Sequence, residues 1–552
     1  MMKLFVVAAL LAASFAQNSS LPEIDLGYEI YRASSFNSTG NFYNFSNIRY
    51  ASAPIGNLRF APPHAPVENR SAVNNGDVSR ICPQASPAWG QAATQFLGSI
   101  LLGLPAPNTT YVVPGANSSS PIPARDPRES EDCLFLDVFV PEDVLTKAGK
   151  GYGAPVLVWI YGGGYTNGNK NQNPAGLIAA SGNSSNGDII YVAMNYRLGA
   201  LGFTSGPTYN AEGGTSNLGL YDQRFALEWV QNNIHLFGGD KNRVTVVGES
   251  AGGGSIMHQI TAYGGSKGKA PFQQAVPQSP GWSAVQSVVQ QENTFQNYLE
   301  LTNTSSLAEL RALSSEEIIM ANAQQVAYDA AWGTYVYGPV VDGNFAPLLP
   351  GQLLAQGRFD KDVRILVGHN AAEGTYFTPP SIRSDATLLN QLRAAYPYAP
   401  QKSLEYIINT LYPAVFDGTH PYTSQFQRAS LIISEGVFTC NTNYLSTAYN
   451  NQTYSYLFAV PPAFHGLDIA YTYYDGGALS PPLGVTNRTI AIALQEFIAS
   501  FAEGGEPEAD GITQFNMYGE DASVLKLNIT GIDEVRDSNA NARCAWWQKG
   551  LY

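Results

Sequence analysis

Charged residues are scarce in this 552-residue chain, where Asp, Glu, Lys and Arg make up 13% of the sequence, about half the usual share. Disordered chains are rich in charge and poor in apolar residues, but 44% of this chain is apolar, so disorder is excluded for most of it. Basic residues are the scarcer sign, with 30 Lys and Arg against 44 Asp and Glu, and they form no block. A nucleic-acid binder would carry a basic stripe, so we expect no nucleic-acid partner.

Long hydrophobic runs are also lacking. No stretch has the roughly 18 unbroken apolar residues that a membrane-spanning helix needs, so we expect a soluble mature chain without a stable membrane anchor. Residues 1–11 (MMKLFVVAALL) carry one Lys and open an apolar run that reaches Phe15. This pattern predicts a signal peptide over 1–16, cleaved after Ala16, and a secreted, extracellular protein, although a buried first strand or helix is the alternative.

Asparagine-linked glycosylation motifs support export independently. Each Asn-x-Ser/Thr triplet alone is a weak signal, but eleven in one chain are typical of a glycoprotein with those asparagines on its surface. N-linked glycans are therefore expected partners. The acceptor residues are Asn18, Asn37, Asn44, Asn69, Asn108, Asn117, Asn183, Asn303, Asn451, Asn487 and Asn528.

Cysteine is rare, with four residues in the whole chain: Cys82, Cys133, Cys440 and Cys544. They lie too far apart for a zinc ribbon or a Cys-x-x-Cys redox site, so we expect no metal site from them. In an oxidising compartment they predict two disulfides, with three possible connectivities. The pairing of each cysteine with its neighbour, Cys82 with Cys133 and Cys440 with Cys544, is only mildly favoured by the sequence.

Short apolar runs predict the fold class. Continuous rather than alternating hydrophobicity is typical of parallel strands covered on both faces. Helical periodicity follows some of them, as in Asp222–Ile234 (DQRFALEWVQNNI), where Asp222 is placed as a helix cap. Strands alternating with helices predict a doubly wound α/β sheet. The clearest strand candidates are Ala154–Ile160, Asp188–Met194, Arg243–Val247, Val363–Val367 and Thr453–Val460.

Three stretches do not follow this alternation. Residues 83–130 are rich in Pro, Ser, Gly and Ala and predict a long excursion outside the sheet, with one apolar patch at Phe96–Leu104. Residues from about 285 to 350 and from 380 to 435 have a more helical pattern and predict insertions beside the sheet. Length alone would suggest three or four domains, but a single large α/β domain over 17–552 accounts for the whole pattern.

A candidate nucleophile follows one of the predicted strands. Arg243–Val247 leads directly into Gly248-Glu249-Ser250-Ala251-Gly252, a G-x-S-x-G motif between an apolar strand and a small-residue helix start. The turn is so tight that the residues two before and two after the serine must be small, and it presents Ser250 above the sheet edge. An ordinary turn is the alternative, and the strand context disfavours it.

A serine nucleophile also needs donors for the negative oxygen that forms on the substrate. Residues 159–165 (WIYGGGY) follow an earlier strand, and glycines let backbone N–H groups approach a developing alkoxide. We assign Gly163, Gly164 and Ala251 as the donors of an oxyanion hole. The alternative for the glycine run is a flexible turn.

The catalytic base and acid should follow the serine in the chain. This order leaves His369, His420 and His465 as candidates for the base. His465 stands in a loop just beyond the strand Thr453–Val460, where catalytic groups of α/β sheets gather. His369 is the second choice. Glu373, just beyond the strand Val363–Val367, would orient the imidazole of the base. A surface histidine and a solvated glutamate near a helix start are the structural alternatives.

The chain resembles a known family, the type-B carboxylesterase/lipase family, in its secreted fungal form. Residues 237–240 (FGGD) and 244–252 (VTVVGESAG) resemble its serine signature, and 131–141 (EDCLFLDVFVP) resembles its second signature. Residues 57–60 (NLRF) and 195–199 (NYRLG) are similar to further landmarks, and the likeness extends from about residue 24 to the end.

The resemblance implies an α/β-hydrolase fold: a large, mostly parallel central sheet with helices on both faces and helical insertions. It implies a Ser–Glu–His triad at Ser250, Glu373 and His465, and a disulfide between Cys82 and Cys133 that closes a lid or gorge-wall loop. It further implies that residues around the triad act in support. Glu249, Ser279 and Asp468 would form a second layer around the triad, and Trp282 would line the acyl pocket.

The resemblance is not complete. A second short disulfide of many relatives has no counterpart, and Cys440 and Cys544 suggest a link near the C-terminal helix instead. No tryptophan marks a choline site, and Trp89 is only a loose positional analogue. We further hypothesise that Phe96–Leu104 covers the mouth of the site and contacts acyl chains, with plain core packing as the alternative.

Together these patterns predict a secreted serine hydrolase that cleaves carboxylic esters through an acyl-serine intermediate. Small-molecule or lipid esters are the expected substrates, and the chemistry requires neither a metal nor an organic cofactor. An interfacial triacylglycerol lipase is the first alternative. A non-catalytic binding or adhesion module on the same fold is the second, disfavoured because every candidate of the triad is present.

Overall fold

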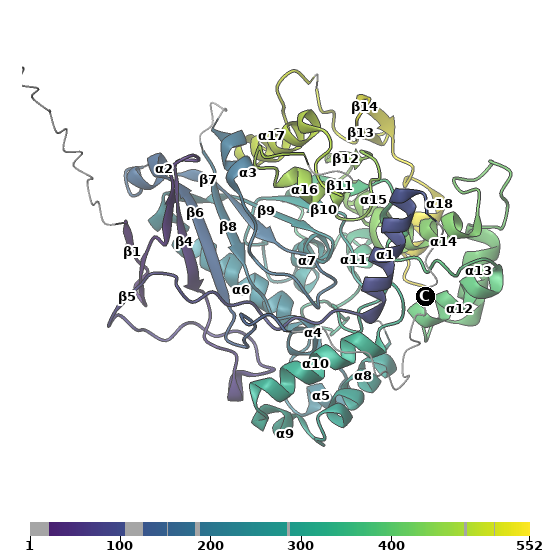
Figure 1. Cartoon of the computed structure of the whole chain (residues 1–552), viewed down its shortest axis with the longest axis horizontal. Coiled ribbons are helices and arrows are strands. Elements are labelled where there is room, and N and C mark those ends of the chain that lie inside the picture. Colours follow the sequence, from purple (N-terminus) through teal and green to yellow (C-terminus); the bar gives the residue numbers. More distant parts are fainter. Residues whose placement is uncertain are drawn as a thin grey trace, which may run out of the picture.

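A mixed sheet of eleven strands forms the centre of the molecule (Figure 1). The structure, a computed structural model, describes residues 21–104, 125–151, 153–182, 188–283, 287–479, 483–512 and 514–552. The six pairings from β8 through β7, β9, β10, β11 and β12 to β13 are parallel, and the pairings at both ends are antiparallel. In order across the sheet the strands are β14 (Gly531–Arg536), β13 (Ser523–Asn528), β12 (Tyr454–Phe458), β11 (Arg364–Asn370), β10 (Gln274–Gln278), β9 (Gly239–Glu249), β7 (Ala154–Ile160), β8 (Ile190–Met194), β6 (Phe135–Pro141), β4 (Phe42–Arg49) and β3 (Ser35–Asn37).

The strand predictions are confirmed, each within a few residues, because the central strands are buried on both faces. All seven residues of β7 and all five of β8 are buried. Their apolar side chains therefore need cover above and below, which only a sheet between two helical layers supplies. A second, three-stranded sheet of β1 (Glu23–Asp25), β2 (Ile30–Arg32) and β5 (Val73–Asn74) lies at the N-terminal side.

Helices cover both faces of the sheet, as expected for the α/β-hydrolase fold (Figure 1). On one face α17 (Arg488–Gly504) contacts β7 and β9 and packs beside α3 (Ala175–Ser181) and α16 (Leu467–Thr472). On the other, α6 (Leu218–Asn233) packs against α7 (Ala251–Ile260), and both contact β9.

The predicted start of the helix at Asp222 is wrong. Helix α6 begins four residues earlier, at Leu218, after Asn217. Asp222 lies inside the helix, fully buried, and binds the guanidinium of Arg197 at 2.7 and 2.8 Å. Aspartate is favoured both as a cap and as the partner of a buried cation, and the periodic pattern does not separate the two uses.

Helical insertions lie beside the sheet, as the sequence predicts for both segments (Figure 1). One group comes from residues before β11 and the other from residues between β11 and β12. The first consists of α8 (Val288–Leu301), α9 (Leu307–Ala312), α10 (Ser315–Asp329) and α11 (Pro350–Ala355); the second of α12 (Asp385–Ala395), α13 (Gln401–Tyr406), η5 (Ile407–Leu411), α14 (Gln425–Ile433), η6 (Ser434–Thr439) and α15 (Cys440–Ala448).

Helix α1 (Ala88–Leu102) contains most of the apolar patch that we hypothesised to be a lid. Phe96 packs on Phe426, with ring centroids 5.3 Å apart, which places α1 against the region of α14. At the other end of the helix, Trp89 contacts four aromatic rings, two of them Tyr335 and Phe377. Helix α1 is therefore an outer layer that packs on the insertions.

Both disulfides of the favoured pairing are present, Cys82 with Cys133 and Cys440 with Cys544. The first closes a 51-residue separation that includes α1, and the second links the start of α15 to the C-terminal helix α18 (Ala542–Trp547). In the part of the chain that the structure describes, no helix is both long enough and apolar enough to cross a membrane.

The predicted signal peptide and the acceptor residues Asn18, Asn108, Asn117 and Asn183 lie outside the described residues. The other seven glycosylation motifs can be placed. Each of their asparagines is at least partly exposed, so none is closed to modification by burial.

Candidate active site

Ser250 occupies a sharp turn between β9 and α7. Its φ of 58° and ψ of −120° place it in a region that L-residues rarely adopt. Its N–H donates to the carbonyl of Gln278 at the end of β10 (3.0 Å), and this bond holds the turn against the neighbouring strand. A Cβ at Gly252 would lie 2.0 Å from the carbonyl oxygen of Ile160, so only glycine permits this close approach. The requirement for small residues around the serine is thereby explained.

The loop after β12 brings His465 to the serine. Its Nε2 lies 2.8 Å from Ser250 Oγ, within hydrogen-bonding distance, and its Nδ1 is bonded to a carboxylate oxygen of Glu373. The loops after β11 and β12 run together here, because Ala372 pairs with Phe464 in a parallel bridge just before the two residues. Neighbouring parallel strands thus deliver all three groups to one edge of the sheet.

Glu373 is fully buried and held by several donors. One carboxylate oxygen accepts from the hydroxyl of Ser279 (2.7 Å) and from the N–H of Asn370 (2.5 Å), while the other faces His465. Burial alone would raise the pKa of Glu373, but the facing imidazole and the accepted hydrogen bonds outweigh it and lower that pKa below its ordinary value. The carboxylate therefore stays ionised and fixes the orientation of the imidazole.

A buried polar network continues behind Glu373. The amide of Asn370 donates to Ser279 Oγ (3.2 Å) and to Asp468 (2.9 Å), and Asp468 also accepts from the hydroxyl of Tyr456 (2.9 Å). Burial raises the pKa of Asp468 to about 6. The structure thus places Ser279 and Asp468 in one chain of hydrogen bonds with the acid, joined by Asn370, which the sequence did not single out.

Glu249, the residue before the serine, lies beside the imidazole of His465. Its buried Oε1 is 3.4 Å from His465 Nε2 and has no hydrogen-bond partner among the described residues. Burial raises the pKa of Glu249. For His465, burial opposes the charged form, but the two carboxylates of Glu249 and Glu373 outweigh it and raise the pKa of the imidazole.

The glycine run after β7 borders the serine. A Cβ at Gly162 would lie 2.9 Å from Ser250 Cβ, so the backbone of the run approaches the nucleophile directly. Gly163 and Gly164 have φ values of 104° and 63°, and Gly164 lines the same pocket as Ser250 and Ala251. Ala251 is the first residue of α7, so its N–H has no partner within the helix. Gly164 and Ala251 therefore border Ser250, and Gly163 lies between Gly162 and Gly164 in the run that approaches it.

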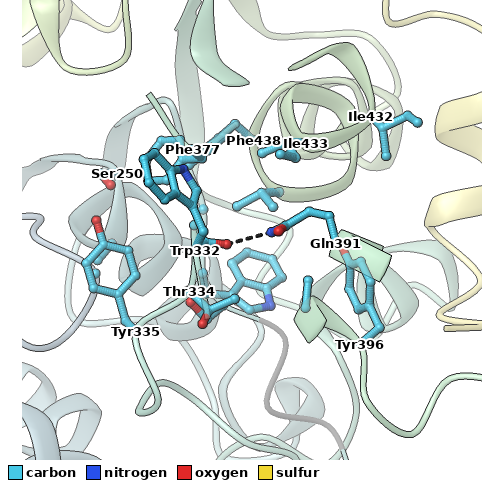
Figure 2. Close-up of a pocket in the computed structure, with 18 of the residues that line it drawn as sticks. Ser250, Trp332, Thr334, Tyr335, Phe377, Gln391, Tyr396, Ile432, Ile433 and Phe438 are labelled. Atoms are coloured by element: carbon cyan, nitrogen blue, oxygen red, sulfur yellow. Dashed lines mark hydrogen bonds between the residues drawn. The ribbon is translucent and has the colours of Figure 1, made fainter. Parts of the chain in front are cut away.

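An aromatic pocket opens in front of Ser250 (Figure 2). It encloses about 720 Å³, including space open to solvent. Trp282 lines it, as the resemblance implies, and its ring packs against the buried His258 at 5.2 Å. Phe377 and Phe438 also contact the imidazole of His465, with ring centroids 5.1 and 4.3 Å away.

Most of the pocket wall was not anticipated from the sequence. Trp332 and Tyr335 come from the segment after α10, and Phe438 from the π-helical turn η6. Gln391 of α12 donates to the carbonyl of Trp332 (2.7 Å), shown as the dashed line in Figure 2. The only local signal was the aromatic density of residues 332–337 (WGTYVY), which does not say what the rings face.

Two other candidates lie away from the serine. His369, the second choice for the base, is buried in β11 and bonded to Asn539 (3.0 Å). None of the described residues that line the pocket belongs to Phe96–Leu104. The patch therefore does not contact the pocket in this structure, and α1 reaches the pocket wall instead through Trp89.

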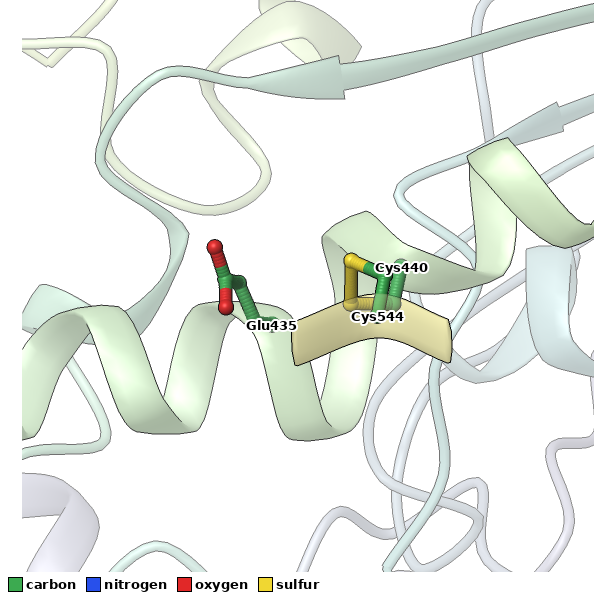
Figure 3. A group of neighbouring side chains, drawn as sticks. All are labelled: Glu435, Cys440 and Cys544. Carbon is green, nitrogen blue, oxygen red and sulfur yellow. A yellow bond between two sulfur atoms is a disulfide. The ribbon is translucent and has the colours of Figure 1, made fainter. Parts of the chain in front are cut away.

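One group of possible metal ligands occurs among the described residues, and its chemistry does not suit an ion. Glu435 lies near Cys440 and Cys544, but the two sulfur atoms are bonded to each other (Figure 3). Glu435 is also the partner of Tyr412 and Arg543. No thiolate is left to coordinate a metal, so the group is a structural link.

This chain is similar to known proteins over most of its length. The family model described as "Carboxylesterase family" matches residues 31–547. The carboxylesterase patB of Aspergillus clavatus is 41% identical over 557 residues, covering 99% of each chain. Lipase 1 of Geotrichum candidum is 30% identical and covers 89% of each chain.

A solved structure extends the agreement to the fold. The crystal structure of Aspergillus niger EstA matches with a TM-score of 0.77 and 26% identity, covering 96% of this chain and 98% of that one. The family model, the relatives and the fold converge on one assignment: the chain belongs to the carboxylesterase family and is a carboxylic ester hydrolase.

Proposed function

We propose that this enzyme is a secreted serine esterase whose triad is Ser250, Glu373 and His465. The observation that carries the proposal is the continuous hydrogen-bonded line from Ser250 Oγ to His465 Nε2 (2.8 Å) and from Nδ1 to Glu373. A serine hydroxyl is a weak nucleophile unless an oriented base stands beside it. The line supplies the base and the group that orients it.

The reaction follows from this geometry in two half-reactions. Ser250 Oγ attacks the ester carbonyl while His465 Nε2 takes the hydroxyl proton, and the carbonyl oxygen becomes an anion. The N–H groups of Gly163, Gly164 and Ala251 stabilise that anion. When the intermediate collapses, the bond to the alcohol oxygen breaks and His465 protonates the leaving alcohol.

Water then repeats the sequence on the acyl-serine. His465 takes a proton from the water as its oxygen attacks, and returns it to Ser250 Oγ as the acid leaves. Glu373 remains ionised throughout and stabilises the imidazolium that forms in each half. Every proton that the reaction moves therefore passes through a residue of this chain.

Labelling of Ser250 tests the proposal. A fluorophosphonate probe should modify the wild-type enzyme at one residue per chain, identified as Ser250 by peptide mass spectrometry. The Ser250→Ala variant should take up no label and should hydrolyse p-nitrophenyl acetate at the background rate. Labelling at another serine, or activity retained by Ser250→Ala, would rule out the assignment.

Export is part of the same proposal. The N-terminal apolar run, the two disulfides and seven partly exposed glycosylation motifs support it. Expressed in a eukaryotic host, the protein should appear in the medium with Gln17 as its first residue. Its mass should fall on treatment with peptide N-glycosidase; retention in the cytosol with Met1 intact would contradict the proposal.

A further inference from the structure

A second cavity lies beyond the aromatic pocket, next to the C-terminal helix α18. It encloses about 460 Å³, including space open to solvent. Residues far apart in the sequence line it, among them Gly351 of α11, Asn441 and Tyr444 of α15, and Trp547 of α18. The second disulfide, Cys440 with Cys544, joins two of these elements.

The two cavities share three lining residues: Trp282, Tyr396 and Val437. Each of these residues lines both Ser250's pocket and the second cavity, so the three lie between the two spaces. They come from the loop after β10, the end of α12 and the π-helical turn η6. Figure 2 shows Tyr396 on the side of the pocket away from Ser250.

The wall made by these residues is firmly supported from behind. The ring of Tyr396 packs against Tyr552, with centroids 5.1 Å apart, and against Trp547 at 6.1 Å. A Cβ at Gly436 would lie 3.3 Å from the Trp547 ring, so the backbone of η6 packs directly on α18. Three residues after Val437 the chain is bonded to α18 through Cys440. The position of the wall is therefore set by the C-terminal helix.

Two side-chain donors beside the second cavity already have partners within the protein. The amide of Asn441 donates to the carbonyls of Pro280 (2.8 Å) and Val437 (2.9 Å), and the hydroxyl of Tyr444 donates to the carbonyl of Cys544 (2.8 Å). A hydrocarbon chain that entered this space would displace water without depriving these donors of their acceptors. Removal of the wall would therefore add space for a longer chain without leaving these donors unpaired.

From this arrangement we propose that Trp282, Tyr396 and Val437 form a partition that sets the longest hydrocarbon chain of an ester the enzyme accepts. The partition closes the catalytic pocket, and the space behind it is unused by substrate in the native enzyme. This inference rests on the proposed function, because it concerns esters bound at Ser250.

Chain-length profiles test the partition. We would measure kcat/KM for p-nitrophenyl esters from two to sixteen carbons, and for a matched series of alkyl acetates in which the alcohol varies. The two series distinguish a chain on the acid side of the ester from one on the alcohol side. The limit is defined as the length at which kcat/KM falls below a tenth of its maximum.

Val437→Ala should move the limit to longer chains by two or more carbons in one series. At two carbons beyond the wild-type limit kcat/KM should rise at least tenfold, since each buried methylene contributes about fourfold. Val437→Leu should shift the limit to shorter chains. Tyr396→Leu opens the same partition from α12 and gives the same lengthening should Val437→Ala not fold.

Ile433→Ala is the matched control. Ile433 lies one turn before Val437 and lines the first pocket but not the second cavity. Its truncation should leave the limit where it is in the wild type. A limit that stays unmoved in both opening variants, or that moves equally in Ile433→Ala, overturns the partition. A wild-type enzyme without activity on the acetate ester would instead overturn the proposed function.

Discussion

The carboxyl edge of the sheet and the helical insertions beside it contribute different things to the same site. Strand ends supply the proposed triad: Ser250 after β9, Glu373 after β11 and His465 after β12. The insertions supply the pocket wall, including Phe438 from η6 and Tyr396 from the end of α12. Parallel strands fix relative positions through a shared hydrogen-bond register, whereas the insertions are placed by side-chain packing, separate hydrogen bonds such as Gln391 to Trp332, and the Cys440–Cys544 disulfide.

Changes in chemistry and changes in selectivity should therefore arise in different parts of the molecule. A substitution at the sheet edge should alter turnover for every ester alike. A substitution in the insertions should alter which esters are accepted while the reacting groups stay in place. Four changes test this division between chemistry and selectivity, and they are ordered by decreasing size of the expected effect.

The largest effect is expected from the base. His465→Ala removes the group that accepts the proton of Ser250, so kcat should fall by at least about 10⁴-fold for short and long esters equally. Steady-state kinetics across the p-nitrophenyl series would measure it, with thermal unfolding as a check on folding. A loss of activity confined to one chain length would show that His465 also shapes the pocket. The division between reacting groups on the sheet and selectivity in the insertions would then be wrong.

The next effect concerns stability on the sheet side. Asp222→Ala leaves the guanidinium of Arg197 buried without its carboxylate, and should lower the free energy of unfolding by about 3–5 kcal/mol. The exposed pair of Lys269 and Asp362 is the control, because Lys269→Ala should leave stability unchanged. Urea unfolding followed by tryptophan fluorescence distinguishes the two, and equal effects would contradict the argument from burial.

The two disulfides separate the regions more directly. Replacing either pair by alanines should cost roughly 2–5 kcal/mol of stability. Only the loss of Cys440–Cys544 should also change the chain-length limit, since this bond holds η6 to α18, whereas Cys82–Cys133 closes the segment that contains α1, which supplies none of the three partition residues. Unfolding and chain-length profiles of both double variants measure this. Equal shifts of the limit in both would mean that the C-terminal link has no special role.

The smallest effect is a change of pH profile at the sheet edge. The carboxylate of Glu249 helps raise the pKa of His465, and the imidazolium cannot act as base, so activity is lost as pH falls through this raised pKa. Burial raises the pKa of Glu249 itself to about 8, so Glu249→Gln removes a negative charge only above that pH, where it lowers the pKa of His465. The acidic limb of kcat/KM should therefore begin at lower pH, and the variant should keep a larger fraction of its activity between about pH 8 and pH 9. Glu228→Gln, an exposed change on α6, should leave the limb in place.

Much of the sheet side could be predicted because local patterns determine it. A continuous apolar run is a sufficient signal for a buried strand, and β7 matches its expected range from Ala154 to Ile160. A polar residue just past such a strand is then a candidate for the site, and this rule selects Ser250, Glu373 and His465. The resemblance added the roles of Ser279 and Asp468, which the structure joins in one network.

The pocket wall could not be predicted, since it depends on contacts between segments distant in the sequence. Trp332 meets Gln391 across 59 residues, and Tyr396 meets Tyr552 across the whole C-terminal region. The error at Asp222 has a related cause: its partner Arg197 lies 25 residues away, outside the window in which a helix start is judged. Periodicity describes an element, but not which distant neighbour its side chains meet.

The backbone conformation at Ser250 has a consequence for the evolution of stability in this fold. A side chain held at a φ of 58° and a ψ of −120° destabilises the native state by about 1–3 kcal/mol relative to relaxed geometry. Glycine would adopt the same turn without that penalty. A lineage released from selection for turnover could therefore gain stability by a single substitution of this serine by glycine. At this residue, stability of the fold and reactivity of the side chain are opposed.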